Sequence, residues 1–215
     1  MAELIADLRA GRVRESLARV REQIALAAVR ARRDPGAVEV LAATKYVAAG
    51  DLPVLAEAGV RLVGENRAQD LEAKHARYGA AFRWHFIGHL QSRKAPAVSA
   101  ICELCHSLAS ESAAKRLTIP ALVEVNLSGE PTKSGIAPED LERFLGVYPD
   151  IRGLMTMPPA SDDPEASRPY FRRLRELAES HGLRELSMGT SQDYVVAADE
   201  GATYVRVGST LYHSP

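Results

Sequence analysis

Short apolar runs rich in β-branched residues alternate along this chain with segments that have helical spacing. The apolar runs lie at residues 38–44, 60–64, 82–88, 100–106, 119–127, 151–157, 183–189 and 202–208. The helix-like segments between them lie at residues 49–58, 65–78, 91–99, 110–117, 137–148, 164–181 and 191–200. Strands that alternate with helices pair in parallel through right-handed crossovers, so the pattern predicts an α/β fold with a parallel sheet.

A long amphipathic helix precedes this alternation. Leu17, Val20 and Ile24 recur in it at helical spacing. Eight strands, seven intervening helices and this extra helix match a single-domain (β/α)8 TIM barrel over residues 1–215, with residues 1–34 packed on the barrel. The alternative is an open doubly wound sheet, but the sequence AATKYVAAGD stands where the glycine-rich fingerprint of that fold belongs.

Composition and charge exclude several classes of function. The 215 residues carry a formal net charge of −1 and a pI near 6.6, so no overall field attracts nucleic acid or an anionic membrane. No apolar run approaches the length of about 18 residues that a membrane span needs. The N-terminal segment mixes acidic residues with its arginines and lacks the apolar core of a signal peptide, so we expect a cytoplasmic protein.

The sequence CELCH, at residues 102–106, fits the patterns of haem attachment, a redox pair and half a zinc site. Covalent haem attachment normally follows export, for which we find no signal, and zinc needs two further ligands. A thioredoxin-like pair should begin a helix, whereas this segment is predicted to be a short strand that runs into a loop. We therefore expect Cys102 and Cys105 to pack as small buried hydrophobic residues, with no metal site.

Polar and glycine residues follow the ends of the predicted strands. They are Lys45, Gly64, Glu65, Asn66, Gly88, His89, His106, Asn126, Thr156, Ser187, Met188, Gly189, Thr190, Ser191, Arg206, Gly208, Ser209 and Thr210. In a (β/α)8 barrel the active site lies at the carboxyl ends of the strands. The contrast between apolar strand bodies and polar strand ends therefore predicts a ligand site at one mouth of the barrel.

Two loops have the composition of a phosphate site. The sequences SMGTSQD and VGSTLY follow the seventh and eighth predicted strands and offer small residues, hydroxyls and free backbone N–H groups. In barrels of this type, phosphate is frequently bound by the loops after these two strands. Either loop alone is explained as well by Ser191 capping a helix and Gly208 making a turn. Both together favour a phosphorylated ligand.

Lys45 ends the first apolar run and would face the two loops across the mouth. A lysine amine forms an imine with a carbonyl when burial keeps it partly neutral. Beside a phosphate site, this chemistry suits a sugar-phosphate carbonyl or pyridoxal 5′-phosphate (PLP). The alternative is a lysine that merely extends from a strand end into water, and position alone leaves the two about even.

Arg206 lies on the opposite face of its strand from Val205 and Val207. If Tyr204 and Arg206 point inward, the guanidinium lies deep in the mouth, near one edge of the ligand. A guanidinium only donates, so it would leave a pyridine nitrogen unprotonated and the ring a weak electron sink. The alternative role is an ion pair inside the barrel with Glu124.

Seven segments, in order, resemble the pyridoxal phosphate homeostasis proteins, which are single-domain relatives of the barrel domain of alanine racemase. They are ATK ending at Lys45, GENRAQD at 64–70, WHFIGHLQSRK at 84–94, VEVNLSGEPTKSGI at 123–136, GLMTMPP at 153–159, LSMGTSQDY at 186–194 and VRVGSTLY at 205–212. The resemblance covers nearly the whole chain.

The resemblance implies that PLP is the cofactor and is held as an aldimine on Lys45. It also implies that Arg206 faces the pyridine nitrogen and that Asn66 lies beside the ring. The cofactor-binding residues of the two loops would be Ser187, Met188, Gly189, Ser191, Gly208 and Ser209. Thr190 departs from the methionine usual in this family. Lys133 is either a second, transient aldehyde site or a surface lysine, and we favour the surface lysine.

These features favour a protein that buffers PLP and delivers it to PLP-dependent apoenzymes, without robust catalysis. A racemase needs acid–base groups on both faces of the cofactor. Lys45 would serve one face, and the eight residues after Val207 leave no room for the second domain of alanine racemase, so we also expect a monomer. Candidates for the other face are Tyr46, His85 and His89. The alternative is therefore a weakly active PLP-dependent racemase, and a Schiff-base aldolase is a weaker third possibility.

Overall fold

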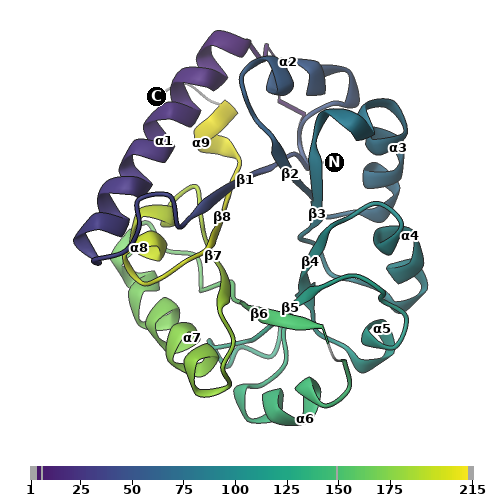
Figure 1. Cartoon of the computed structure of the whole chain (residues 1–215), viewed down its shortest axis with the longest axis vertical. Coiled ribbons are helices and arrows are strands. Elements are labelled where there is room, and N and C mark those ends of the chain that lie inside the picture. The colour runs from purple at the N-terminus through teal and green to yellow at the C-terminus, as the bar shows by residue number, and fades with distance from the viewer. Residues whose placement is uncertain (1–3, 6, 149, 213–215) are drawn as a thin grey trace.

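A closed barrel of eight parallel strands forms the centre of the molecule (Figure 1). The computed structural model describes residues 4–5, 7–148 and 150–212. The strands are β1 (Glu39–Ala43), β2 (Leu62–Glu65), β3 (Arg83–Phe86), β4 (Leu104–Leu108), β5 (Ala121–Glu124), β6 (Ile151–Met155), β7 (Glu185–Thr190) and β8 (Tyr204–Val207). They pair in chain order, and β8 closes on β1. The predicted (β/α)8 TIM barrel is confirmed.

Helices surround the barrel and connect its strands (Figure 1). They are α2 (Leu52–Glu57), α3 (Ala68–Tyr78), α4 (Ala95–Ser99), α5 (Glu111–Ala114), α6 (Leu141–Leu145), α7 (Arg168–Ser180) and α8 (Tyr194–Asp199). The additional helix α1 (Ala10–Arg30) packs against α8 and against α9 (Ser209–Tyr212), which follows β8. The predicted N-terminal helix is thus confirmed. Across the described part of the chain, no helix combines the length and the apolarity that crossing a membrane requires.

Alternate residues of each strand face the barrel interior and the surrounding helices. In β8, Val205 and Val207 are fully buried in the core beneath the helices. Tyr204 instead packs on a small interior cluster made of Leu104, Leu122 and Met155. Arg206, two residues further along β8, lies on the same inner face and lines the cavity at the mouth. Tyr204 and Arg206 therefore both point into the barrel, which is the condition under which the sequence places Arg206 deep in the mouth.

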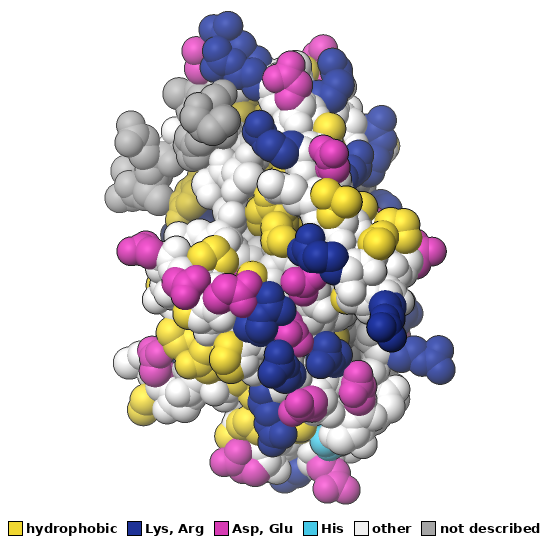
Figure 2. Space-filling model, turned by 90° about the vertical axis from the view of Figure 1, so that its left-hand side faces the viewer, with side chains coloured by type: hydrophobic (Ala, Val, Ile, Leu, Met, Phe, Trp, Pro, Cys, Tyr) yellow, Lys and Arg dark blue, Asp and Glu magenta, His cyan; other side chains and the backbone are white. Residues whose placement is uncertain are grey.

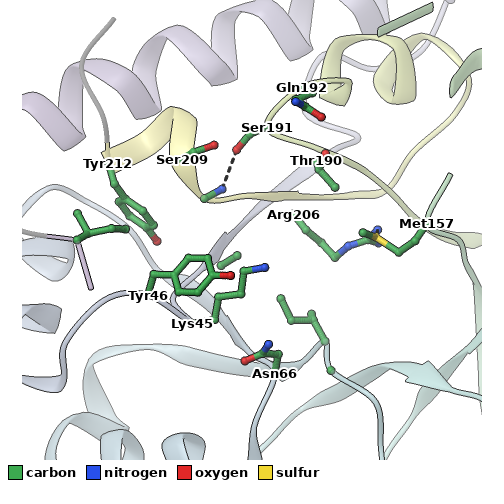
Figure 3. Close-up of a pocket in the computed structure, with 15 residues that line it drawn as sticks. Lys45, Tyr46, Asn66, Met157, Thr190, Ser191, Gln192, Arg206, Ser209 and Tyr212 are labelled. Atoms are coloured by element: carbon green, nitrogen blue, oxygen red, sulfur yellow. Dashed lines mark hydrogen bonds between the residues drawn. The ribbon is translucent and has the colours of Figure 1, made fainter. Parts of the chain in front are cut away.

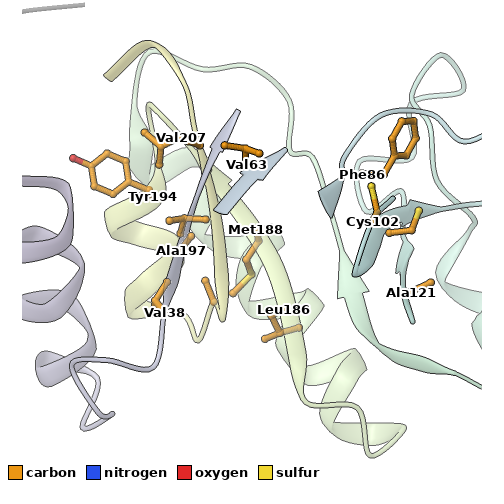
Figure 4. Close-up of a cluster of buried hydrophobic side chains, with 14 of the residues drawn as sticks. Val38, Val63, Phe86, Cys102, Ala121, Leu186, Met188, Tyr194, Ala197 and Val207 are labelled. Carbon is orange, nitrogen blue, oxygen red and sulfur yellow. The ribbon is translucent and has the colours of Figure 1, made fainter. Parts of the chain in front are cut away.

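The main hydrophobic core lies between the barrel and its helices. One face of α1 contributes Val13, Leu17, Val20 and Ile24, all almost completely buried. Figure 4 shows Met188 of β7 in the same core as Ala197 and Tyr194 of α8. Burial of one such large aliphatic side chain contributes about 1.5–3 kcal/mol, so this core holds the last two strands firmly against α8 and α1.

The fourth strand begins later than the sequence predicts. The apolar run at 100–106 is not one strand, because α4 ends in a turn in which Cys102 N donates to Val98 O over 2.8 Å. β4 starts only at Leu104 and ends at Leu108. His106 therefore lies in the middle of a strand and inside the barrel, and our placement of it at the strand end was wrong.

Both cysteines pack as the sequence predicts. Cys102 is 5% exposed and Cys105 is fully buried, and neither forms a disulfide. Burial raises the pKa of the Cys105 thiol to about 11 and raises that of Cys102 as well. At neutral pH both are thiols, so they are poor nucleophiles and behave as small hydrophobic side chains.

Candidate functional site

A cavity of about 470 Å³ opens at the carboxyl ends of the strands (Figure 3). It is lined by Ile5, Ala43, Lys45, Tyr46, Asn66, Ile87, Gly88, Met157, Thr190, Ser191, Gln192, Arg206, Gly208, Ser209 and Tyr212. Its volume is in the usual range for a small-molecule site. The cavity brings together six of the predicted binding residues, namely Lys45, Asn66, Ser191, Arg206, Gly208 and Ser209.

Lys45 lies two residues beyond the end of β1, at the rim of this cavity. Its side chain is exposed rather than buried, and its Nζ lies 4.8 Å from the centre of the Tyr46 ring. Thr44, the preceding residue, is held by the surrounding helix α3, because Lys74 Nζ donates to Thr44 O over 2.8 Å. The backbone before Lys45 is thus anchored, while its amine is exposed at the mouth.

The two predicted phosphate loops meet at Ser191. Its Oγ accepts a hydrogen bond from the backbone N–H of Gly208 at 3.1 Å (Figure 3). It accepts a second from the backbone N–H of Thr210 at 3.3 Å. In return, Thr210 Oγ1 donates to Ser191 O over 3.1 Å. Because Ser191 Oγ accepts both backbone bonds, its own proton remains available for a ligand. Ser209 lines the cavity beside it.

Asp193 holds the first of these loops in shape, and the sequence analysis missed it. One carboxylate oxygen accepts from Thr190 N at 2.6 Å and from Thr190 Oγ1 at 3.0 Å. The other oxygen accepts from Ser167 Oγ at 2.7 Å. The loop also needs Gly189, which has a φ of 90°, and an added Cβ there would lie 2.5 Å from Ala197 Cβ. The three-residue spacing from Thr190 to Asp193 was the available signal, since aspartate commonly closes such turns.

Arg206 forms the inner wall of the cavity and is 6% exposed. Its guanidinium donates from Nη1 to Ser187 Oγ over 2.5 Å, and from Nη2 to Thr156 O over 3.0 Å. Among the described residues no ion pair within 4.0 Å joins it to Glu124, although the Glu124 charge acts to raise the pKa of Arg206. Burial lowers the pKa of Arg206 to about 10, so it stays cationic at neutral pH. Burial also raises the pKa of Glu124 to about 7, against the opposing effect of the Arg206 charge.

Three predicted binding residues do not line the cavity. Ser187 is fully buried beneath Arg206, and Met188 is fully buried on the outer face of β7. Gly189 packs its backbone against α8. Ser187 thus contacts Arg206, and Met188 packs in the hydrophobic core. Direct contact of Ser187, Met188 and Gly189 with a ligand stays a prediction.

Other residues at the predicted strand ends have structural roles. Glu65 is fully buried on the outer side of β2, where its Oε1 pairs with Lys74 Nζ at 2.5 Å. Gly88 allows its loop to approach Asn66, because a Cβ at Gly88 would lie 2.0 Å from Asn66 O. Lys133 pairs with Glu130 over 3.7 Å and is not among the residues that line the cavity.

The sequence profile of the family described as "Alanine racemase, N-terminal domain" matches residues 16–215. The fold and the site place the chain in this class of barrel proteins, and it belongs to this family. Two curated relatives are each named "Pyridoxal phosphate homeostasis protein". That of Aquifex aeolicus is 38% identical over 92% of this chain and 96% of its own length. That of Pseudomonas aeruginosa is 37% identical over 93% and 94%. Within the family, the chain belongs to the pyridoxal phosphate homeostasis proteins.

Solved structures agree with this placement. PipY of Synechococcus elongatus, solved with PLP bound, is 30% identical and superposes with a TM-score of 0.74 over 90% of this chain and 100% of that one. A structure of an unknown protein from Bifidobacterium adolescentis is 32% identical and has a TM-score of 0.84 over 98% of both chains. The likeness therefore extends over nearly the whole of each molecule.

Proposed function

We propose that this protein binds PLP reversibly on Lys45 and buffers the supply of this reactive aldehyde. The observation that carries the proposal is that Lys45, Arg206 and the loop serines Ser191 and Ser209 line one cavity. The relatives named for PLP homeostasis, and PipY with PLP bound, support the choice of cofactor.

The cavity residues fit each part of the cofactor. The amine of Lys45 would hold the aldehyde as an imine, with the carbonyl oxygen leaving as one water. Ser191 and Ser209 would offer hydroxyl donors to the phosphate, and the small residues around them would let its oxygens approach the backbone. Arg206 presents N–H donors at the inner wall, where it would face the pyridine nitrogen. When bound, PLP would supply an electron-withdrawing ring. Because the Arg206 guanidinium keeps its proton, the pyridine nitrogen would stay unprotonated and the ring would withdraw electrons only weakly.

The arrangement favours a carrier over a racemase. The titratable groups among the described lining residues are Lys45, Tyr46, Arg206 and Tyr212. His85, considered as an acid–base group, is buried in the barrel interior, and burial lowers its pKa to about 3. Burial and the nearby Glu65 raise the pKa of Tyr212, so it is a poor proton acceptor at neutral pH. A racemase would therefore depend on Tyr46 as the acid–base group on the face of the cofactor opposite Lys45.

The test is the visible absorption spectrum of the purified protein with added PLP, before and after borohydride. We expect the wild type to become yellow and borohydride to fix the label on Lys45. Lys45→Ala should stay colourless, while Lys133→Ala, a matched change of a loop lysine, should behave as the wild type. A wild type that stays colourless would reject PLP in favour of a sugar-phosphate carbonyl trapped on the same lysine.

The second arm of the test separates carrier from enzyme. Alanine incubated with the PLP-loaded protein in heavy water should exchange its α-proton no faster than with Lys45→Ala, as followed by proton NMR. Exchange that is present in the wild type and lost in Tyr46→Phe would instead support the weak racemase. Delivery of PLP to apoenzymes, and action as a monomer in the cytoplasm, are further parts of the proposal.

A further inference from the structure

Four buried polar side chains form a continuous chain through the barrel interior. His85 Nδ1 and His106 Nε2 are 2.9 Å apart, and His106 Nδ1 and Ser187 Oγ are 2.7 Å apart. Ser187 Oγ is in turn 2.5 Å from Arg206 Nη1. These residues come from β3, β4, β7 and β8, and they are between 0% and 6% exposed. The proposed binding site does not use the two histidines.

Arg206 and Glu103, at the two ends of this chain of hydrogen bonds, favour one direction for its bonds. A guanidinium has no acceptor, so Ser187 accepts from Arg206 and keeps its own proton available to donate onward, while the Glu103 carboxylate near His85 Nε2 favours a proton on that nitrogen. The acceptor of that proton is His106 Nδ1, which places the proton of His106 on Nε2. That proton is donated to His85 Nδ1, so His85 also carries its proton on Nε2. Both rings are then neutral, in agreement with burial, which lowers the pKa of each.

The interior around the two rings supports this single arrangement. The Tyr204 ring meets His85 edge to face at 5.6 Å between centres, and meets His106 in the same way at 5.0 Å. His85 Nε2 is directed towards Glu103, whose Oε2 is 3.9 Å away and half-exposed at the opposite end of the barrel. Two further donors of Arg206, both on Nη2, are taken up by Thr156 O and by Met157 Sδ at 2.8 Å. The guanidinium is thus held at several points.

We propose that Ser187, His106 and His85 are positioning residues that fix the guanidinium of Arg206 at the inner wall of the cavity. This inference rests on the proposed function, because the hydrogen-bonded side chains affect cofactor binding only if Arg206 faces the cofactor ring. Rotation of the guanidinium would break its bond to Ser187 and leave a buried N–H donor of a charged group without an acceptor, which is costly. The hydrogen bonds from His85 to Arg206 therefore keep the guanidinium in one orientation towards the cofactor ring.

The first test does not need the cofactor. Nitrogen NMR of the ¹⁵N-histidine-labelled wild type at neutral pH should show two buried neutral rings, each protonated at Nε2. Assignment follows from the signals lost in His85→Phe and His106→Phe. A doubly protonated His106, or one that carries its proton on Nδ1, would overturn the proposed direction of the chain, whatever the outcome with PLP.

The second test measures PLP binding by titration of the visible absorption. Ser187→Ala should still become yellow, because Lys45 is intact, with an altered absorption maximum and roughly tenfold weaker binding, as expected for the loss of one buried hydrogen bond to a charged group. Ser187→Thr keeps the hydroxyl and should restore both, and Ser112→Ala, at an exposed serine, is the control. A Ser187→Ala protein with wild-type spectrum and affinity would reject the positioning role. A wild type that never colours would instead reject the proposed function and leave the NMR result standing.

Discussion

Lys74 reaches from α3 to the end of β2, where it meets a carboxylate that water does not reach. Glu65 Oε1 accepts from Lys74 Nζ at 2.5 Å and from Thr44 Oγ1 at 2.6 Å. Glu65 Oε2 is buried without a hydrogen-bond partner among the described residues. Lys74 thus neutralises a buried charge next to Lys45, and its removal would leave that charge unpaired.

We predict that Lys74→Met lowers the free energy of unfolding by about 3–5 kcal/mol, because removing one partner of a buried pair strands the other. Urea titration followed by circular dichroism measures the change. The control is Lys115→Met, at an exposed position, which should alter stability by no more than about 0.5 kcal/mol. If the double variant Glu65→Gln/Lys74→Met recovers part of the lost stability, the result supports the charge argument. Equal stability of Lys74→Met and the control Lys115→Met would contradict it.

At the residue scale, the sequence predicted the groups that contact the cavity better than those that support them. Lys45 and Arg206 were found because each follows a simple rule about strand ends or strand faces. Glu65 was expected at the mouth, yet it faces outward, since the side-chain period of two puts it on the other side of β2 from Gly64. The role of Ser187 depends on a bond to His106 across 81 positions of the sequence, which no local pattern reveals.

The loop between β7 and α8 depends on a single carboxylate for its shape. Asp193 is 8% exposed and accepts three hydrogen bonds, two from Thr190 and one from Ser167. Thr190 and Ser191 both line the cavity, so the conformation that Asp193 imposes determines where the Ser191 hydroxyl points. This makes Asp193 a positioning residue for the proposed phosphate site.

We predict that Asp193→Ala weakens PLP binding roughly tenfold while the bound protein remains yellow. A tenfold loss corresponds to about 1.4 kcal/mol of binding free energy, which we expect from the loss of order in the loop. The amine of Lys45 is unaffected, so the bound protein keeps its colour. The measurement is a titration of the visible absorption. Asp162→Ala, at an exposed aspartate of the preceding loop, should bind as the wild type. Unchanged affinity in Asp193→Ala would show that phosphate binding does not depend on this loop.

At the scale of elements, the alternation of strands and helices was sufficient to predict the order of the barrel. Each of the eight strands lies within or overlaps a predicted apolar run. The largest discrepancy is at β4, where residues 100–103 have the composition of a strand but form the turn after α4. Composition does not distinguish a buried turn from a buried strand, and there the sequence analysis placed His106 at the wrong depth.

At the scale of the whole molecule, closing the barrel brings Lys45, from the first strand connection, against loops that follow the last two strands. Only this closure joins segments about 150 residues apart into one cavity. The fold was therefore the necessary step from a list of polar strand ends to a site. A cavity at this mouth could be expected from the sequence because the order of strands and helices already implied the closure.

The outer surface bears on the proposed monomer. Figure 2 shows Lys and Arg side chains interspersed with Asp and Glu over the face that carries α1, with apolar side chains scattered among them. The large hydrophobic residues exposed in the described part of the chain include Leu26 and Val29 of α1, at 56% and 57%, and Tyr46 and Met157 at the cavity. Obligate dimers usually bury more than about 2,000 Å² of mainly apolar surface. Two neighbouring residues on one helix fall far short of that.

We therefore predict that the protein has a mass close to 23.3 kDa by light scattering on a sizing column, with and without PLP. Independence from PLP follows because the cavity opens at the barrel mouth, while the exposed apolar pair lies on α1. Twice this mass would contradict the monomer. The variant Leu26→Asp/Val29→Asp would then locate the contact, since a return to the lower mass would assign it to the face of α1, and persistence of the dimer would direct attention to Tyr46 and Met157 at the mouth.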